Sequence, residues 1–141
     1  MNNEEELNEK LAKWAGFYQR LAHIYMGEKL KEPMPQWDSP DGHKNIVLPD
    51  FIKSLDNCYK WLVPKLEQRK LTIQNYSFKQ KSGRFYAEYN IYEESTTAYG
   101  TPVLCGNRLA IDYQEGNDLG EISALALCKA IEKLIDSDEK A

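Results

Sequence analysis

The chain has 141 residues, of which 42% are hydrophobic and 28% charged, and its formal net charge is −4. This length and apolar share predict one globular domain, spanning residues 1–141, with a core of its own. The acidic balance argues against nonspecific binding to nucleic acid, because such binding depends on Lys and Arg neutralising phosphates. No run of residues approaches the roughly 18 apolar positions of a membrane span, and the start lacks the pattern of a signal peptide. We therefore expect a cytoplasmic protein with no membrane association.

The three cysteines, Cys58, Cys105 and Cys128, lie far apart and form no CxxC pair. Neither a disulfide framework nor a zinc knuckle is indicated by this spacing. Cys58 and Cys128 fall within apolar stripes, where a cysteine is expected to act as a small core residue.

Apolar side chains recur every three or four residues over the first segment, which predicts one long amphipathic helix. Asn3 and Glu6 resemble a capping box at its start, and Gly27 is the expected stop. The residues expected on its buried face are Leu7, Leu11, Trp14, Phe17, Tyr18, Leu21, Ile24 and Tyr25.

A rigid, turn-rich loop, Trp37-Asp-Ser-Pro-Asp-Gly42, comes next and is followed by Leu48-Pro-Asp-Phe51. Prolines fix the backbone here, and Asp-Gly favours a tight turn. Asp50 is the expected N-cap of a second helix. Pro64 removes a backbone donor, so we expect a kink, or an end near Trp61 with a fresh turn beyond.

From Leu71 the apolar period changes to two, which predicts strands over 71–79 and 84–92 joined through Lys81-Ser-Gly83. A third strand is expected from about Val103 to Tyr113, interrupted at Gly106-Asn107. The second predicted strand should place Phe85, Ala87, Tyr89 and Ile91 on one face.

Asp118 and Glu121 form a second capping box at the start of the last helix. Residues 122–128 are apolar on nearly every side, which is typical of a helix packed on more than one neighbour. Beyond Ile135 we expect a frayed acidic tail. The order of elements predicts an α+β fold, with three main helices on both faces of an antiparallel sheet of three to four strands.

Three of these segments resemble one known family. The Trp37–Gly42 loop, the Leu48–Phe51 entry into a helix, and the closing Ser123-Ala-Leu-Ala-Leu-Cys-Lys-Ala-Ile-Glu-Lys-Leu-Ile135 are similar to the phage ABA-sandwich proteins, small phage and prophage domains largely of unknown function. The resemblance implies a three-layer α/β/α sandwich and a place in the cytoplasm of a bacterial host. It carries no established catalytic residues.

No catalytic group stands out from the sequence. His23 and His43 are the only histidines, and a Cys105–His43 dyad is conceivable in space although the spacing does not require it. Asp38, Asp41 and His43 are oxygen and nitrogen donors close in sequence, but turn chemistry explains them better than a cation site. Hence we expect no catalytic residue, no metal and no cofactor.

Aromatic residues are the unusual feature, with nine tyrosines and three tryptophans. Together with arginines they are able to stack on a nucleotide base, to anchor a protein interface, or simply to cover the solvent side of a small sheet. The candidate ligand-binding residues are Trp37, Asp38, His43, Arg84, Tyr86, Tyr99 and Arg108.

Two functions follow as hypotheses. The first is a non-enzymatic phage accessory protein that sequesters a nucleotide-like signal and so counters a host defence. The second is an inhibitor that binds a host protein directly through an acidic and aromatic surface. A nucleotide hydrolase is third, with no identified residues. We also expect a homo-oligomer, since surface tyrosines and an apolar helix suit a symmetric dimer.

Overall fold

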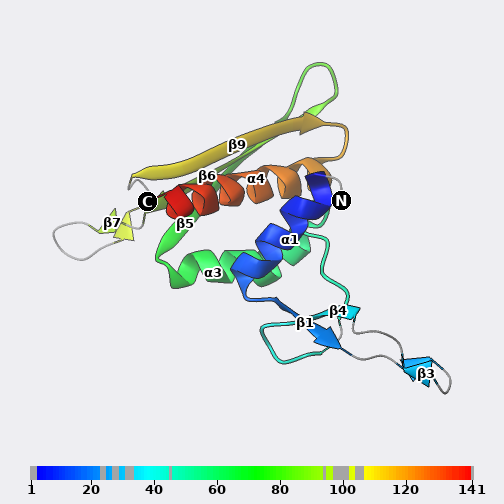
Figure 1. The fold of residues 1–141 in the computed structure, drawn as a ribbon. Coiled ribbons are helices and arrows are strands. Elements are labelled where there is room, and N and C mark those ends of the chain that lie inside the picture. Colours follow the sequence, from blue (N-terminus) through cyan, green and yellow to red (C-terminus); the bar gives the residue numbers. More distant parts are fainter. Residues whose placement is uncertain are drawn as a thin grey trace.

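The computed structural model describes residues 3–22, 25–26, 29–30, 34–44, 46–93, 95–96, 102–103 and 107–140. They form an α+β domain of helices and small antiparallel sheets (Figure 1). The helical segments are α1 (Asn3–Ala15), α2 (Leu55–Asn57), the π-helical turn η1 (Cys58–Leu62), α3 (Val63–Gln68) and α4 (Leu119–Lys140). None of the described helices is long and apolar enough to cross a membrane.

The main sheet has three antiparallel strands in the order β5-β6-β9, with bounds Leu71–Lys79, Phe85–Glu93 and Arg108–Gly116. Smaller antiparallel pairs join β1 (Tyr18–Ala22) to β4 (Met34–Asp38), β2 (Tyr25–Met26) to β3 (Lys29–Leu30), and β7 (Ser95–Thr96) to β8 (Pro102–Val103). The two strands predicted for the hairpin are confirmed to within one residue. The third strand starts only after the predicted interruption, because Val103 belongs to a separate pairing with Ser95.

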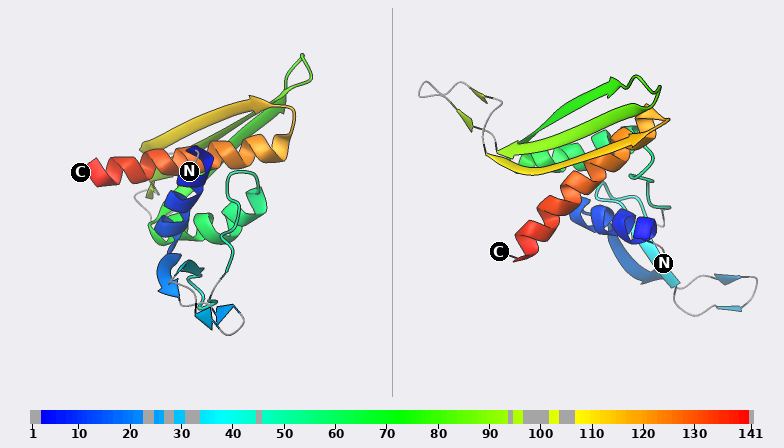
Figure 2. Two further views of the ribbon diagram at one scale, coloured as in Figure 1. Left: turned by 45° about the vertical axis from the view of Figure 1, so that its right-hand side comes forward. Right: turned by 90° about the horizontal axis from the view of Figure 1, so that it is seen from above.

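Helix α4 lies between the sheet and the other helices (Figures 1 and 2). Asp118 accepts a hydrogen bond from the Glu121 backbone N–H (3.0 Å), as the capping box predicts. The helix contacts β6 and β9 on one side and α1, α2 and η1 on the other. Its fully buried residues include Ala124, Leu127 and Ile131, so its nearly all-round apolar character is explained by two packing partners. It continues to Lys140, through the residues expected to fray.

The predicted long first helix is wrong in its second half. Helix α1 stops at Ala15 because Gly16 adopts φ +104°, and the Gly16 and Phe17 N–H groups bond back to the Lys13 and Ala12 carbonyls (3.1 and 3.0 Å). This pair of bonds is a Schellman motif, which ends a helix. The chain then becomes strand β1, where Tyr18 and Leu21 are 53% and 69% exposed rather than buried.

The second helix begins at Leu55 rather than directly after Asp50. Ser54 is its N-cap, accepting a hydrogen bond from the Asn57 N–H (3.3 Å), while Asp50 closes a preceding turn by accepting from the Lys53 N–H (3.2 Å). The irregularity expected at Pro64 is present as η1: Val63 N–H bonds to Cys58 C=O, one residue further back than in an α-helix. Pro64 then sits in the first turn of α3, where a missing donor costs little.

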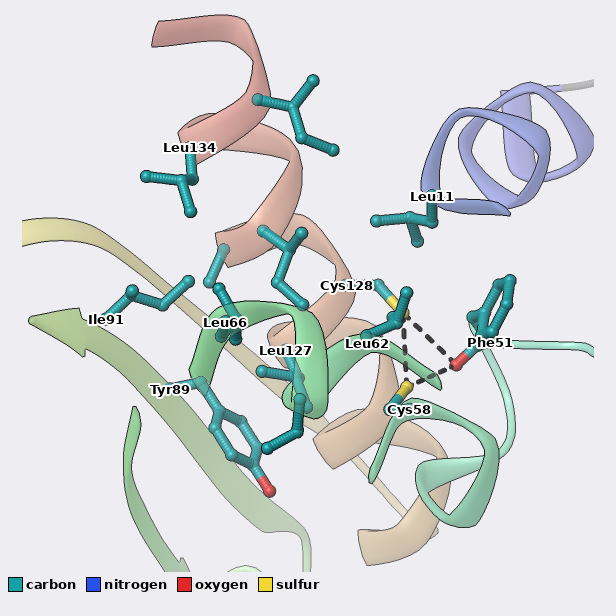
Figure 3. Close-up of a cluster of buried hydrophobic side chains, with 14 of the residues drawn as sticks. Leu11, Phe51, Cys58, Leu62, Leu66, Tyr89, Ile91, Leu127, Cys128 and Leu134 are labelled. Carbon is teal, nitrogen blue, oxygen red and sulfur yellow. Dashed lines mark hydrogen bonds between the residues drawn. The ribbon is translucent and has the colours of Figure 1, made fainter. Parts of the chain in front are cut away.

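Helical segments α1, α3 and α4 lie on the same side of the three-stranded sheet (Figures 1 and 2). The buried faces of β6 and β9 meet α4, and Tyr89, Ile91, Leu66, Leu127 and Leu134 pack together there (Figure 3). The α+β class is therefore confirmed. The predicted helix layer on the second face of the sheet is absent from the part of the chain described.

The junction between β9 and α4 is closely packed at Gly116. A methyl group added there would lie 2.7 Å from Ile122 Cγ2, which no real contact tolerates, whereas one added at Gly120 meets Asp118 Oδ1 at an ordinary 3.4 Å. We expect Gly116→Ala to lower the free energy of unfolding by about 1–3 kcal/mol through overpacking. The matched Gly120→Ala should be neutral or slightly stabilising, because alanine favours helix. Urea unfolding of both variants measures this, and equal effects would contradict it.

Candidate functional site

The predicted site residues fall in two separate places. Trp37, Asp38 and His43 belong to the β1–β4 region, whereas Arg84, Tyr86 and Arg108 belong to the three-stranded sheet. The helices lie between these two regions (Figures 1 and 2), so the described residues form no common pocket from both groups. Tyr99 and the cysteine of the conceivable Cys105–His43 dyad lie outside the described residues, as does His23.

The Trp37 loop is held by contacts of its own. Trp37 is half-buried against the core, and its carbonyl accepts the Ile46 N–H (2.9 Å). Asp38 is only 1% exposed and pairs with Arg20, whose Nε lies 2.7 Å from Asp38 Oδ2. A buried carboxylate matched by a guanidinium joins strands β1 and β4, which is a structural role.

Asp41 and His43 form the tip of the same loop. Gly42 N–H bonds to Ser39 C=O (3.1 Å), and the Ser39 hydroxyl accepts the His43 N–H (3.0 Å) and donates to Asp41. Hydrogen bonds from His43 and then Ser39 lower the pKa of Asp41 to about 2. Within the described ranges no cluster of three or more His, Cys, Asp or Glu is placed to hold a metal.

The side of the sheet turned away from the helices carries a row of aromatic rings. In the register of β5, β6 and β9, Phe78 faces Tyr86, and Tyr76 and Tyr113 flank Glu88. Ring centroids are 5.6 Å apart for Tyr76–Phe78, 5.0 Å for Phe78–Tyr86 and 5.5 Å for Tyr86–Tyr113. We call these four rings, with Glu88 and the buried Asn90 beside it, the open aromatic face. Tyr76 and Tyr113 are 61% and 58% exposed, so aromatic side chains from both edge strands reach solvent on this face.

Glu88 is the charged centre of this face. Its two carboxylate oxygens accept hydrogen bonds from the Tyr86 hydroxyl (2.7 Å) and from Asn90 Nδ2 (2.9 Å). The Asn90 bond, the Tyr86 bond and the nearby charge of Arg108 lower the pKa of Glu88 below its ordinary 4.5. Burial and the hydrogen bond to Glu88 raise the pKa of Tyr86 to about 12. The centre is thus a fixed negative charge ringed by tyrosines.

Of the predicted residues, Tyr86 belongs to this face, and Arg108 and Arg84 lie beside it. Arg108 is the strand partner of Tyr92, and Arg84 Nη2 donates to the Glu115 carbonyl (3.4 Å). The predicted site residues did not include Tyr76, Phe78, Glu88, Asn90 and Tyr113. A signal existed, since the alternation in the first two strands places Phe78 and Glu88 opposite the predicted core positions.

The hollows on the described surface lie elsewhere. One of about 350 Å³ separates α1 from residues 48–53 and is lined by acidic side chains, including Glu4, Glu5 and Glu9, with Lys53. A smaller one, about 240 Å³, lies between α3 and the start of β5. The open aromatic face is therefore a surface rather than a pocket, and small-molecule sites are usually concave.

Cys58 and Cys128 are core residues, as predicted. Their sulfur atoms lie 3.6 Å apart, and both thiols donate to the Phe51 carbonyl (3.0 and 3.2 Å), as Figure 3 shows. The neighbouring Cys58 thiol and burial raise the pKa of Cys128 far above its ordinary value, which disfavours a reactive thiolate.

Comparison with known proteins gives no relative. No family model matches the chain, and neither a curated protein nor a solved structure shows significant similarity to it.

Glu88 yields a prediction about stability and pH. Glu88→Gln replaces one acceptor oxygen by an amide that meets a donor, so at neutral pH we expect a loss of about 1–2 kcal/mol in unfolding free energy. Because the folded pKa of Glu88 is lowered, the carboxylate's contribution exists above the unfolded pKa and disappears as pH falls through the folded value. The difference between wild type and variant should stay constant from about pH 7 to about pH 5 and shrink only as the pH falls below about 4.5, through the lowered pKa of the folded protein. Equal differences in urea titrations at about pH 7 and about pH 3 would contradict it.

The two core thiols yield a second prediction. In a Cys105→Ser background, both remaining thiols should react with a chromogenic disulfide reagent only as fast as the protein opens, because both are fully buried. Labelling should become rapid in denaturant. Immediate reaction of either thiol in the native protein would contradict the core assignment.

Proposed function

We propose that this protein is a non-enzymatic inhibitor that binds another protein through the open aromatic face of its sheet. The observation that carries the proposal is the arrangement around Glu88: a hydrogen-bonded carboxylate with Tyr76 and Tyr113 on its two sides and Tyr86 next to it. Tyrosines that remain exposed in a contiguous row are typical anchors of protein interfaces.

The chemistry of the face also favours one kind of partner. A guanidinium or ammonium group placed over the tyrosine rings would gain cation–π attraction and would pair with Glu88. Glu88 already has two donors that hold it in place, so little ordering is required when a cation arrives. The partner is therefore a host protein that presents an arginine or lysine side chain from an otherwise apolar surface.

The phage or prophage setting belongs to this proposal, on the strength of the loop and helix motifs that resemble the phage ABA-sandwich family. The three-layer α/β/α arrangement that this resemblance implies belongs to the proposal as well. In the described residues the helices lie on one face of the sheet, and a helix of the partner lying across the open face would supply the third layer.

The second candidate is sequestration of a nucleotide-like signal on the same face. It is favoured by the stacked rings of Phe78, Tyr86 and Tyr113, on which a base can stack, with Arg84 and Arg108 nearby for phosphates. The central carboxylate and the absence of a hollow at these rings make it the weaker of the two. Among the residues that the structure describes, no group of side chains supports a nucleotide hydrolase.

The proposal is tested by affinity capture with matched tyrosine variants. Tagged wild-type protein should retain a specific protein from a lysate of the bacterium that carries the gene, and Tyr113→Ala should lose it, because an anchoring ring is removed. Tyr18→Ala is the control: it truncates a tyrosine of similar exposure (53% against 58%) in strand β1, on the far side of the helices. It should retain the partner.

If both variants retain the captured protein equally well, the open aromatic face is not the binding surface. Calorimetry with cyclic dinucleotides and ADP-ribose derivatives separates the second candidate. If wild type and Tyr18→Ala give heat of binding with one of these nucleotides and Tyr113→Ala gives none, a nucleotide ligand is favoured over a protein partner.

A further inference from the structure

The two margins of the main sheet differ in how they are protected. Strands β5 and β9 are both edge strands of the order β5-β6-β9 (Figure 2, right). Unpaired edges present rows of backbone donors and acceptors that another strand can use, so proteins usually guard them with charges, bulges or covering side chains.

The β9 edge carries such guards. Strand β9 contains three charged residues, Arg108, Asp112 and Glu115. Lys133 of α4 donates to the Ile111 carbonyl (2.7 Å) and to Asp112 Oδ1 (3.2 Å), so a charged side chain covers this margin. The register with β6 also shifts at Ile91/Tyr92, which interrupts the ladder.

The β5 edge has none of these features. Its nine residues include a single charge, Lys79, at the end, and no proline or glycine. Residues 74–79 are all exposed, and in the described part of the chain β5 pairs with β6 alone. A long and nearly uncharged edge is a template for strand addition.

We infer that β5 pairs with β5 of a second copy of this chain, antiparallel across a twofold axis, to form one continuous six-stranded sheet. A register centred on Asn75 pairs all nine residues, with Gln74 opposite the partner's Tyr76 and Thr72 opposite the partner's Phe78. Lys79 then faces Leu71, so no like charges oppose each other. Strand β9 carries three charged residues, so the same self-pairing would be less favourable at that edge.

The pairing has a consequence for the open aromatic face. Even-numbered residues of β5 point to that face in both copies, because antiparallel pairing centred on residue 75 places even positions opposite even positions. The twofold axis is perpendicular to the sheet, so both aromatic faces lie on the same side. The dimer thus presents one surface of twice the width.

Sedimentation equilibrium with two tyrosine variants tests the inference. Tyr76 and Tyr113 lie on the same face, flank the same Glu88 and are almost equally exposed (61% and 58%), but they belong to opposite edge strands. Wild type should dimerise at micromolar concentration. Tyr76→Lys should weaken dimerisation about tenfold or more, since the axis doubles the effect and brings two ammonium groups close. Tyr113→Lys should leave the dimer intact.

A cross-link checks the register. Residues paired across antiparallel strands have Cα atoms about 4.5–5.5 Å apart, within reach of a disulfide. In a Cys105→Ser background, Asn75→Cys should give a covalent dimer when diamide oxidises the two facing thiols, whereas Tyr113→Cys should not.

A monomeric wild type, or a dimer that withstands Tyr76→Lys, would overturn the inference. A dimer lost equally with both lysine variants would mean that two open faces pack on each other instead, and would overturn it too. The capture experiment with Tyr113→Ala measures partner binding and not dimerisation. The pairing of β5 and the proposed inhibitory function can therefore fail independently.

Discussion

The structure depends on helix α4 being able to bury side chains on almost every side. Its alanines and leucines meet the sheet through β6 and β9, and its opposite side meets α1 and η1. Apolar burial is the main favourable term in folding, and this one helix joins the core surfaces of β6 and β9 to those of α1, α2 and η1. Alanine at positions 124, 126 and 130 permits close approach, since a larger side chain would not fit at zero exposure.

Because α4 occupies one face of the sheet, the other face is left to polar and aromatic side chains. Those rings are ordered by their strand register and by Glu88, not by a covering layer. Such a face is stable in solution because tyrosine combines an apolar ring with a hydroxyl that water or a carboxylate can bind. The same arrangement leaves Tyr76, Phe78 and Tyr113 exposed to solvent.

Much of the fold was predictable where one local signal dominated. The alternation over 71–92 gave both strands of the hairpin, and Asp118 gave the start of α4. The first helix was predicted too long because apolar spacing in residues 17–25 suits a helix as well as a strand with one exposed side. Gly16 held the deciding information: only a left-handed residue there closes the two Schellman bonds. The site was harder, because which aromatic residues lie together depends on register between strands far apart in the sequence.

Tyr18 and Asp38 are register partners, so the chain leaves the domain after residue 18 and returns beside it at residue 38. The ion pair between Arg20 and Asp38 holds the two ends of this segment together. The length of chain between those two points does not alter where either end is anchored. Loop-closure entropy grows only slowly with added residues, about 0.6 kcal/mol per doubling. This excursion is consequently the natural place for related sequences to gain or lose residues, and for a reporter to be inserted, while the remaining framework keeps its dimensions.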